Sequence, residues 1–545
     1  MKCHTAILIL FVLVICASMQ LVAQQAASPA RSALRVTAED LLARPVGDNW
    51  TSYNGDYTGR RFSGLQEITP ANVAQLRAAW VFHPGNTQRL EATPVVVRGI
   101  MYLTSSNDVW ALDARTGRSV WHYSRPISSG LLDDAAAHKS RGVAVWDHFV
   151  YSETDDAHLL CLDARSGNLI WDVQFADKVK HYGGTSAPLV VKDTVVVGSS
   201  GGDSGVRGFL AAFDAMTGKQ KWQLWTIPGP GEFGSSSWPG DAYLHGGATT
   251  WLPGTYDPEL DTLYWTTSNA APDFVGDTRP GDDLYTACVL AIDPNTGKLK
   301  WHFQFTPHDL YDYDANETTV LVDAEENGSL RHLLVQADRN GFFYVLDRTD
   351  GKFLRATPFV EKLNWAKSID SSGRPVLSDR IPTKEGAYIC PSILGATNWF
   401  SPSYNPKTGL FYVMALERCD LFFAKPQVFT KGETYYATGT KLPPNEHAQK
   451  ILMALSVRDG KEAWRYLQTG PGNSWGGTLT TAGGLVFVAD DADSLEAVDA
   501  ETGHALWHFN TGQSFSASPM TYAVDGVQYV AISAGSDVFS FALPR

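Results

Sequence analysis

The stretch Ala111-Leu112-Asp113-Ala114-Arg115-Thr116-Gly117, followed four residues later by Trp121, decides the fold of this chain. Asp, two or three turn residues and then Gly are typical of a tight turn, in which Gly supplies the positive φ angle. The apolar residues before this turn and the short apolar run after it predict two antiparallel strands joined as a hairpin. We interpret Trp121 as a core residue that packs one sheet on the next.

The same pattern occurs seven times along the chain. Trp121, Trp171 and Trp222 follow one another at 50 and 51 residues, and Trp464 and Trp507 are 43 residues apart. Such intervals are typical of one four-stranded sheet per repeat. The longer intervals 222–301 and 354–464 predict insertions rather than missing repeats. The seven copies are 111–121, 161–171, 212–222, 291–301, 345–354, 454–464 and 497–507.

The two ends of the repeat region predict an eighth sheet. Residues Ser516–Phe541 supply strands after the last motif, and Leu76–Phe82 carry a tryptophan without preceding strands of their own. A sheet shared by both ends closes a ring and leaves no free edge. The sequence therefore predicts an all-β chain, with an N-terminal extension at 28–75 and one eight-bladed β-propeller at 76–545, closed by pairing of its N- and C-terminal strands.

The first 27 residues predict a secretory signal peptide. Lys2 gives a basic start, and the apolar run Ala6–Ala17 is too short to argue firmly for a membrane span. We therefore expect export to the periplasm, without a stable membrane span. The net charge of −14 argues against nucleic acid as a partner and suits a basic protein or a metal ion.

An oxidising compartment allows a disulfide among the four cysteines that follow the leader. The sequence has no Cys-x-x-Cys-His motif, so no covalently attached c-type haem is predicted.

An acidic stretch, Pro307–Asp314, carries three carboxylates in six residues. If it is extended, Asp312 and Asp314 project to one face. Two acids on one face repel each other unless a cation, a proton or water compensates. The stretch is thus either an exposed acidic loop with turn-forming Asp residues, Asp309 among them, or part of a cation site.

The repeats and the motifs between them resemble the quinoprotein alcohol dehydrogenases, which use pyrroloquinoline quinone (PQQ) and a metal ion at the propeller axis. The resemblance runs from Asn49-Trp50 to about Phe541. Within the family, the chain is similar to the methanol-dehydrogenase-like branch, whose members have no fused cytochrome. It implies a periplasmic enzyme that oxidises an alcohol, a polyol or a sugar to a carbonyl and passes electrons to a separate soluble cytochrome c. A homodimer is one assembly that the sequence leaves open.

The resemblance implies a PQQ site built by residues between the repeats. Arg141 matches an arginine that pairs with a PQQ carboxylate, and Arg339 matches a base that contacts the quinone oxygens. Trp251 matches the tryptophan that supports the ring plane. Permanently charged guanidinium groups suit carboxylates, and an aromatic floor suits a flat quinone. The other matches to cofactor contacts are Glu91, Thr185, Ser200, Asn398 and Trp475.

The resemblance also implies a metal ion and a catalytic base. Asp203, Asn269 and Asp312 match metal ligands, and their oxygen atoms suit a hard cation. Asp312 is also the implied proton acceptor, with Arg339 as the second catalytic residue. Asp314 stands where calcium-type methanol dehydrogenases have a small residue and lanthanide-dependent relatives have Asp, which favours a lanthanide. Asp203 is shorter than the usual Glu, so calcium stays an alternative.

Each of these residues alone also fits an ordinary role, as an exposed charge, a core tryptophan or a turn former. Their order along the chain, nearly one per repeat, favours convergence at one mouth of the propeller. The alternative class is a non-catalytic interaction scaffold of the outer-membrane assembly type, which would keep the repeats and lose this set.

The sequence departs from methanol dehydrogenases in two further ways. Residues 135–137 are three alanines where those enzymes carry adjacent cysteines, so the vicinal disulfide is absent. The chain ends soon after the eighth sheet, which predicts a more open site for primary or secondary alcohols, polyols or sugars. The resemblance implies a disulfide between Cys390 and Cys419, and Cys161 and Cys288 are expected to be buried thiols.

Overall fold

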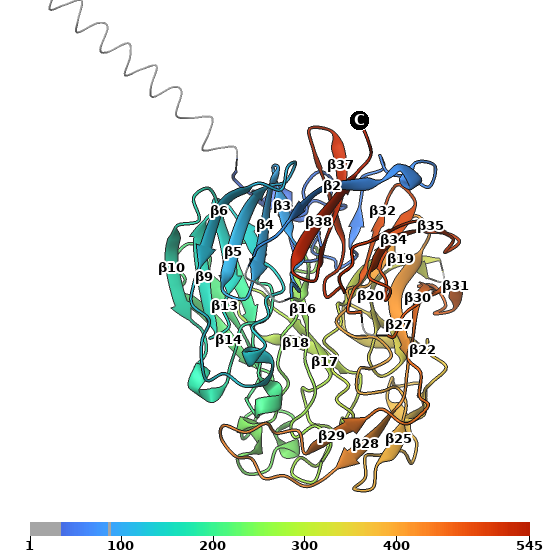
Figure 1. Ribbon diagram of the computed structural model, residues 1–545. Coiled ribbons are helices and arrows are strands. Elements are labelled where there is room, and N and C mark those ends of the chain that lie inside the picture. Colours follow the sequence, from blue (N-terminus) through green and yellow to red (C-terminus); the bar gives the residue numbers. More distant parts are fainter. Residues whose placement is uncertain (1–33, 86–88, 327, 473) are drawn as a thin grey trace, which may run out of the picture.

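The computed structural model describes residues 34–85, 89–326, 328–472 and 474–545, and β-strands make up nearly all of its regular structure (Figure 1). The predicted signal peptide, 1–27, lies outside the described residues. Two short α-helices, α3 (Ala38–Leu42) and α4 (Asp133–Ala136), occur in these ranges. Within the same ranges, no helix has the length and apolar character that crossing a membrane requires.

The strands of the described residues form eight sheets of four or five strands. Five of the sheets are antiparallel meanders that follow chain order. They are β3–β6 (Val95–Val97, Ile100–Ser105, Asp108–Asp113, Ser119–Ser124), β7–β10 (Ala144–Trp146, Phe149–Glu153, His158–Asp163, Leu169–Gln174), β11–β14 (Leu189–Val191, Thr194–Gly198, Phe209–Asp214, Gln220–Trp225), β15–β18 (Thr255–Asp257, Thr262–Thr266, Cys288–Ile292, Leu299–Gln304) and β19–β22 (Val320–Glu326, Ser329–Ala337, Phe342–Asp347, Lys352–Pro358).

The other three sheets contain strands from distant parts of the chain. They are β26, β27, β30 and β31 (Ser403–Asn405, Leu410–Glu417, Gln449–Ser456, Glu462–Leu467); β32–β35 (Thr478–Thr481, Leu485–Ala489, Ser494–Asp499, Ala505–Asn510) with β1 (Phe62–Ser63); and β36–β38 (Met520–Val524, Val527–Ala534, Asp537–Ala542) with β2 (Arg77–Phe82).

The core lies between the faces of neighbouring sheets. The first three strands of a sheet are nearly continuous in buried residues, as in β11, β12 and β13. The fourth strand alternates exposed and half-buried residues, as in β10. A strand that is buried on both faces reads as a continuous apolar run, whereas an outer strand faces water on one side. The fourth strand of each repeat is therefore the outermost.

Strands from distant parts of the chain pair in one sheet. β2 pairs antiparallel with β38, from Arg77 opposite Ala542 to Phe82 opposite Val538. β1 adds a parallel strand to β32, so part of the predicted N-terminal extension also joins a sheet. The boundary between that extension and the propeller stays a prediction.

Arg61 ties the N-terminal segment to the last two sheets. Its side chain is fully buried and donates hydrogen bonds to the carbonyl oxygens of Tyr53 (2.6 Å), Thr478 (3.1 Å) and Pro519 (2.6 Å). Burial lowers the pKa of Arg61 to about 10. Among the described residues Arg61 has no carboxylate partner, and three carbonyl oxygens hold this cation because each satisfies one edge of the guanidinium group.

The repeated tryptophan contacts the turn of the next sheet. Trp121 Nε1 donates to Ala164 O at 3.0 Å, and a Cβ atom on Gly167 would lie 2.6 Å from the Trp121 ring. Gly167 has a φ angle of +72°, so this turn needs glycine both for its backbone and for the space. The same indole donation runs from Trp80 to Ala114, Trp222 to Pro294, Trp464 to Ala500 and Trp507 to Leu76.

The sheet β19–β22 is the exception, because its motif ends in Leu354 rather than Trp. There the next turn glycine, Gly460, faces Thr357 instead of an indole, with 2.4 Å between its Cβ position and Thr357 Oγ1. The prediction that the repeated tryptophan packs one sheet on the next is confirmed for the sheets that have one.

The long interval 354–464 holds insertions, as predicted. A hairpin of β23 (Ala366–Ile369) and β24 (Pro375–Leu377) comes first, followed by a sheet of β25 (Ala387–Ile389), β28 (Asp420–Ala424) and β29 (Thr438–Lys441). In Figure 1 this three-stranded sheet lies at the bottom, away from β37 and β38.

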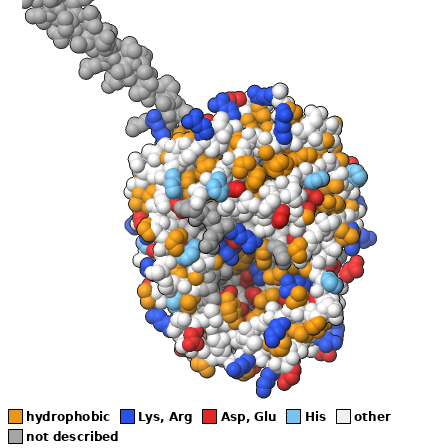
Figure 2. All heavy atoms as spheres, viewed as in Figure 1, with side chains coloured by type: hydrophobic (Ala, Val, Ile, Leu, Met, Phe, Trp, Pro, Cys, Tyr) orange, Lys and Arg blue, Asp and Glu red, His pale blue; other side chains and the backbone are white. Residues whose placement is uncertain are grey.

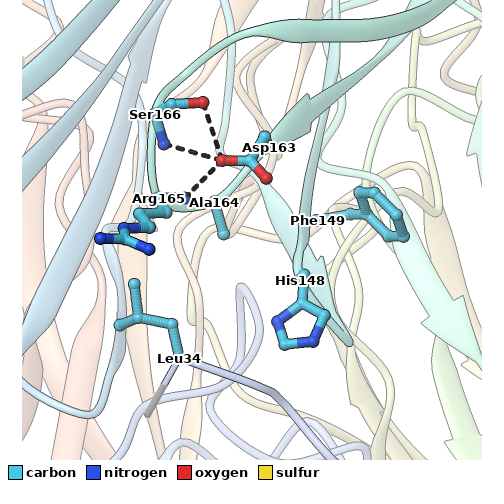
Figure 3. A pocket seen from close by; sticks show the side chains of 7 residues that line it. All are labelled: Leu34, His148, Phe149, Asp163, Ala164, Arg165 and Ser166. Atoms are coloured by element: carbon cyan, nitrogen blue, oxygen red, sulfur yellow. Dashed lines mark hydrogen bonds between the residues drawn. The ribbon is translucent and has the colours of Figure 1, made fainter. Parts of the chain in front are cut away.

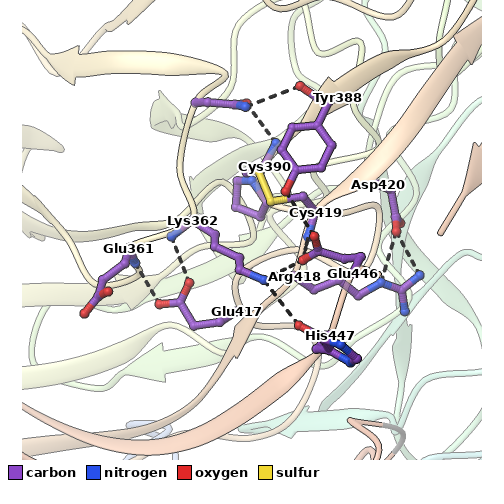
Figure 4. The surroundings of a disulfide bond; sticks show 12 residues. Glu361, Lys362, Tyr388, Cys390, Glu417, Arg418, Cys419, Asp420, Glu446 and His447 are labelled. Atoms are coloured by element: carbon purple, nitrogen blue, oxygen red, sulfur yellow. Dashed lines mark hydrogen bonds and ion pairs between the residues drawn. A yellow bond between two sulfur atoms is a disulfide. The ribbon is translucent and has the colours of Figure 1, made fainter. Parts of the chain in front are cut away.

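The predicted disulfide is present between Cys390 and Cys419, with an S–S distance of 2.07 Å. Glu446 Oε1 accepts the Cys419 N–H at 3.1 Å and pairs with Lys362 at 2.5 Å (Figure 4). The insertion is thus anchored to the sheet that carries β27 and β30. Cys161 and Cys288 are buried free thiols, as predicted.

Replacing Gly167 with Ala should destabilise the protein more than replacing Gly526, which has a similar φ of +74° but nothing within 4 Å of its Cβ position. Positive φ alone costs roughly 1–2 kcal/mol for Ala, and the clash with Trp121 should add about 1–3 kcal/mol. Denaturant unfolding of the two variants measures the difference. Equal unfolding midpoints would contradict a structural role for the indole–glycine contact.

Candidate functional site

The predicted site residues lie in loops before the first strand or after the second strand of a sheet, and these two loops are found at the same end of the sheet. Because neighbouring strands are antiparallel, the start of the first strand and the end of the second strand lie at the same end of a sheet. Ser200 and Asp203 follow the second strand β12, Asn269 follows the second strand β16, and Arg339 follows the second strand β20. The others precede first strands and are Glu91, Arg141, Thr185, Trp251, Asp312, Asp314, Asn398 and Trp475.

Most of these side chains line one cavity of about 220 Å³. Figure 2 shows a face of the molecule that is hollowed near its centre, with acidic and basic side chains inside the hollow. Nine of the predicted residues line the 220 Å³ cavity, namely Arg141, Asp203, Trp251, Asn269, Asp312, Asp314, Arg339, Asn398 and Trp475. The structure therefore brings together side chains that span more than half of the chain.

Arg339 lies at the centre of an acidic group. Its Nη2 is 2.8 Å from Asp314 Oδ2, its Nη1 is 4.0 Å from Asp312 Oδ2, and its Nε is 3.5 Å from Glu317 Oε1. Burial alone would lower the pKa of Arg339, but the surrounding carboxylates outweigh burial and raise it. A further hydrogen bond, from Nη2 to Asn398 Oδ1 at 3.2 Å, fixes the plane of the guanidinium group.

The acids around Arg339 outnumber it. Burial and the neighbouring charges of Asp314 and Asp203 raise the pKa of Asp312 well above its usual value, although Arg339 opposes them. Burial and Asp338 do the same to the pKa of Glu317. One guanidinium group does not neutralise these carboxylates. The excess negative charge of the cavity therefore favours the binding of a cation.

Every residue of the acidic stretch Pro307–Asp314 is buried or half-buried, so the exposed-loop interpretation is wrong. Asp309 is fully buried, and its carboxylate accepts the N–H groups of Tyr311 and Tyr313 at 2.9 Å each. Burial raises the pKa of Asp309 to about 6. The turn-forming role expected for Asp309 is confirmed, but in the interior of the protein.

The stretch is also not extended. Asp312 has a φ angle of +60°, a conformation that is uncommon for a residue with a side chain and that occurs often at functional sites. Asp312 and Asp314 nevertheless both reach the cavity, because the turn that Asp309 caps redirects the backbone between them. The side chains of Asp312 and Asp314 therefore share one cavity because the backbone turns, and not because side chains alternate along a strand.

Asp314 and Asn269 contact each other directly. Asp314 Oδ1 accepts the backbone N–H of Asn269 at 2.6 Å, which leaves the Asn269 side chain at the cavity wall. Asn269 Nδ2 is buried and has no hydrogen-bond partner among the described residues. Within the described ranges, no three His, Cys, Asp or Glu side chains form a group that could hold a metal ion as they stand.

Arg141 lies between aromatic rings at the other side of the cavity. Its Cζ is 4.8 Å from the centroid of Trp251 and 5.0 Å from that of Trp399. Trp399 in turn stacks on Trp475, with centroids 6.1 Å apart and planes 14° apart. Arg141 also pairs with Glu91 at 3.2 Å. The cavity thus combines a fixed cation with flat aromatic walls.

Thr185 and Ser200, two predicted cofactor contacts, are not among the residues that line the 220 Å³ cavity. The carbonyl oxygen of Thr185 accepts a hydrogen bond from Arg141 Nη1 at 2.9 Å. Ser200 is buried, and its hydroxyl has no hydrogen-bond partner among the described residues. The roles of the Thr185 and Ser200 hydroxyl groups stay predictions.

The residues fit the groups that the sequence implies. Ser200 Oγ and Arg141 Nε are buried polar atoms without hydrogen-bond partners in the described structure, which is typical of a site that a polar ligand completes. Three carboxylates and an amide suit a hard cation, and two arginines suit an anionic flat ring. The chain therefore has the chemistry to hold PQQ and a metal ion.

Three further residues line or support the site and were missed by sequence reasoning. Trp399 directly follows Asn398 and lines the cavity, Lys139 lies two residues before Arg141, and Glu317 contacts Arg339 from behind. Proximity to the matched residues was the only signal for the first two. Nothing in the sequence indicated a role for Glu317, because a single acidic residue before a strand is typical of any surface loop.

A second cavity, of about 710 Å³, adjoins the first and shares Lys139, Trp399 and Trp475 with it. Glu91 lines this second space, together with Ser106 and Asp108. The hydroxyl of Ser106 is buried without a hydrogen-bond partner among the described residues. The 220 Å³ cavity is therefore bordered by a larger, partly polar cavity on the side of Glu91.

Another hollow, of about 490 Å³, lies at the β9–β10 turn and does not contain site residues (Figure 3). Asp163 Oδ1 accepts hydrogen bonds from the backbone of Arg165 and from the backbone and hydroxyl of Ser166, at 2.8–3.1 Å. These bonds hold the repeat turn. Leu34, the first described residue, forms one wall, so this hollow carries no functional assignment.

Comparison with known proteins agrees with this geometry. The chain matches the family described as "PQQ: Glucose/ethanol/alcohol dehydrogenase, beta-propeller domain" over residues 50–363 and 461–530. The quinoprotein alcohol dehydrogenase PedH of Pseudomonas putida is 36% identical, over 92% of this chain and 88% of that protein. The 1-butanol dehydrogenase (cytochrome c) of Thauera butanivorans is also 36% identical, over 90% of this chain and 75% of that protein.

A solved structure of a europium-containing methanol dehydrogenase superposes with a TM-score of 0.85 at 31% identity, over 92% of this chain and 99% of that chain. The all-β architecture, the acidic cavity and the extent of these matches agree. The chain therefore belongs to the family of PQQ-dependent quinoprotein alcohol dehydrogenases.

Proposed function

We propose that this enzyme oxidises an alcohol to a carbonyl compound in the cavity between Trp251 and Arg339, with PQQ and one metal ion held there. The observation that carries this proposal is the convergence of three carboxylates, Asn269 and two arginines on one cavity. Eight sheets and the β2–β38 pairing support an eight-bladed ring closed by the two ends of the chain. The interaction-scaffold alternative has no comparable support.

Each residue has a part in the proposed reaction. Arg141 and Arg339 hold the anionic cofactor, and Trp251 supports its ring. Asp203, Asn269, Asp312 and Asp314 supply oxygen atoms for the metal ion. When bound, PQQ accepts the electrons of the alcohol and the metal ion acts as a Lewis acid.

Asp312 accepts the proton of the alcohol hydroxyl group in this proposal. Its carboxylate lines the cavity, and the turn capped by Asp309 holds its backbone in place. Arg339 donates to the backbone carbonyl oxygen of Asp312 at 3.1 Å and so also holds this residue in place. A positioned proton acceptor of this kind typically contributes about 10²–10⁴ in rate.

The additional carboxylate of Asp314 supports a lanthanide rather than calcium as the bound ion. A trivalent cation gains more from each negative oxygen atom than a divalent cation does. The similarity to a europium-containing methanol dehydrogenase also supports this choice. Calcium stays the alternative. Asp203 has a shorter side chain than the Glu that is usual at this position, so the arrangement of the metal ligands can differ from that in the lanthanide-dependent relatives.

A separate soluble cytochrome c is the proposed electron acceptor. No Cys-x-x-Cys-His motif occurs in the sequence, so a haem attached to this chain is not expected. A relative is named as a 1-butanol dehydrogenase (cytochrome c). The apolar leader of the sequence supports export to the periplasm. A homodimer stays a prediction.

The substrate is proposed to be larger than methanol. The 710 Å³ space beside the site gives room for the part of the alcohol that does not react, and its polar wall suits further hydroxyl groups. Primary or secondary alcohols, polyols and sugars are therefore the proposed substrate class. Activity on methanol alone in a substrate panel would contradict this.

Asp312→Asn should lower kcat by about 10³ while PQQ binding is retained, because the amide keeps the shape but cannot accept the proton. Steady-state kinetics of the reconstituted enzyme with a dye acceptor measures this. Asp379→Asn is the control, because the Asp379 side chain is 94% exposed and lies outside the cavity. An Asp312→Asn enzyme with more than about a tenth of the parent kcat would rule out a base role.

Asp314→Asn should weaken europium binding about tenfold and change calcium binding much less, because it removes one negative charge and keeps an acceptor for the Asn269 N–H. Asp314→Ala should act in the same direction. Europium luminescence titration, with calcium as competitor, measures both affinities without turnover. An equal loss for the two ions would argue against Asp314 as the basis of lanthanide preference.

Arg141→Gln should weaken PQQ binding by about 10–100-fold, because it removes a buried, charge-assisted partner of a carboxylate. Equilibrium dialysis with PQQ measures this directly. Arg380→Gln, at a side chain that is 55% exposed and outside the cavity, is the control. Unchanged PQQ affinity in the Arg141 variant would place the cofactor carboxylates elsewhere.

A further inference from the structure

A cavity of about 420 Å³ lies across a thin wall from the catalytic cavity. The short 3-10 helix η3 (Gly202–Ser204) contributes Asp203 to the catalytic cavity, and its last residue, Ser204, lines the second space together with the next three residues, 205–207. Its volume is within the range of small-molecule sites. The cavity takes no part in the reaction proposed above.

Aromatic and aliphatic groups form its walls. Phe429 stacks on His245 with ring centroids 3.6 Å apart and planes 18° apart. Trp225 and Leu244 also line the space, and they remain 40% and 43% exposed. Large apolar side chains that line a concave space and remain exposed to water mark a place where a ligand can cover them.

The charged groups in the lining are all positive. Lys180, Lys431 and Arg207 line the cavity, and none of its described lining residues is Asp or Glu, although the chain has a net charge of −14. Such a local reversal of charge attracts an anion to this part of the surface. Exposed Glu232 approaches Arg207 at 3.9 Å but is not part of the lining.

Arg207 is held in a fixed position. Its Nε and Nη2 both donate to the carbonyl oxygen of Ile227, at 2.9 and 2.6 Å, and its Cζ lies 4.6 Å from the Trp225 ring centroid. A guanidinium group that is already oriented loses little entropy when it binds an anion. It therefore presents a positive charge beside an aromatic face.

The wall that carries Phe429 is fixed to the site loop. Phe429 lies in the loop between β28 and β29, and Tyr435 of the same loop donates its backbone N–H to Asp203 O at 2.6 Å. Gly205 has a φ angle of +70°, and a Cβ atom there would lie 2.6 Å from Phe429. The close approach of Phe429 is thus built into the backbone.

We infer that this cavity binds a small planar aromatic anion. The ring would lie among Trp225, Phe429 and Leu244, and the carboxylate, sulfonate or phosphate group would lie near Lys180, Lys431 and Arg207. Aromatic faces and permanent positive charges in one concave space match both parts of such a ligand. Binding there needs neither PQQ nor turnover, so the inference is independent of the proposed reaction.

The test uses two dyes with the same ring system and the PQQ-loaded enzyme. 8-Anilinonaphthalene-1-sulfonate is the anionic probe, and N-phenyl-1-naphthylamine is the neutral one. The anionic dye should bind at one site at least about tenfold more tightly than the neutral dye, because only its sulfonate meets the cations. Fluorescence titration and calorimetry give the affinity and the stoichiometry.

Variants then locate the dye. Lys431→Glu should weaken the anionic dye at least about fivefold and leave the neutral dye unchanged, because it reverses one charge of the lining. Lys425→Glu makes the same change in the same loop outside the lining and should leave both dyes within about twofold. Trp225→Leu should weaken both dyes, since it removes ring contact.

Three results would overturn the inference. They are no binding of the anionic dye, equal or tighter binding of the neutral dye, and equal effects of Lys431→Glu and Lys425→Glu. Because the readout is dye binding, a negative result here leaves the alcohol-oxidation proposal as it stands, and loss of alcohol oxidation would not affect this inference.

Discussion

The contact between a tryptophan of one sheet and the glycine turn of the next is the interaction on which the rest of this structure depends. It joins the outer strand of one repeat to the turn of its neighbour, as between Trp121 and Gly167. The indole ring packs directly on the glycine, where a Cβ atom would clash with it, and this close contact restricts how the two sheets can be oriented. The loops at the ends of the sheets then meet at fixed distances, and the cavity follows from that arrangement.

The 220 Å³ cavity has the opposite character, because its acidic side chains repel each other. Arg339 contacts Asp314, Asp312 and Glu317, and the pKa values of Asp312 and Glu317 are raised despite the nearby guanidinium group. Such a site is costly to form without a partner of positive charge. The regular packing of the sheets supplies the stability that lets the chain keep it.

The repeats and their ends could be predicted because their signals are local. Asp, Gly and Trp at fixed spacing specify a hairpin and an inter-sheet contact, and the intervals are typical of one four-stranded sheet per repeat. The site residues came from motifs between repeats, and nine of them line one cavity. The shape of the loops could not be predicted, because it depends on burial and on partners far along the chain. Asp312 at positive φ and Asp309 in the interior are examples.

Glu317 and the apolar loop residue Phe429 show the same limit from another side. Neither belongs to a motif, and each contacts a residue outside its own loop, Arg339 across the β19–β20 hairpin in one case and the distant Gly205 in the other. Sequence pattern identifies which groups carry chemistry. It does not identify what packs behind them.

The pairing of β2 with β38 has a consequence for how the chain reaches its folded state. β2 is made near the start of the chain, and its partner is the last strand of the described residues. Arg61 likewise finds one of its acceptors, Pro519, 458 residues away. Closing so long a loop is slow, because its entropy is lost before the contacts form. β2 must therefore stay unpaired until β38 has been made, and during that time its open edge is exposed to other chains.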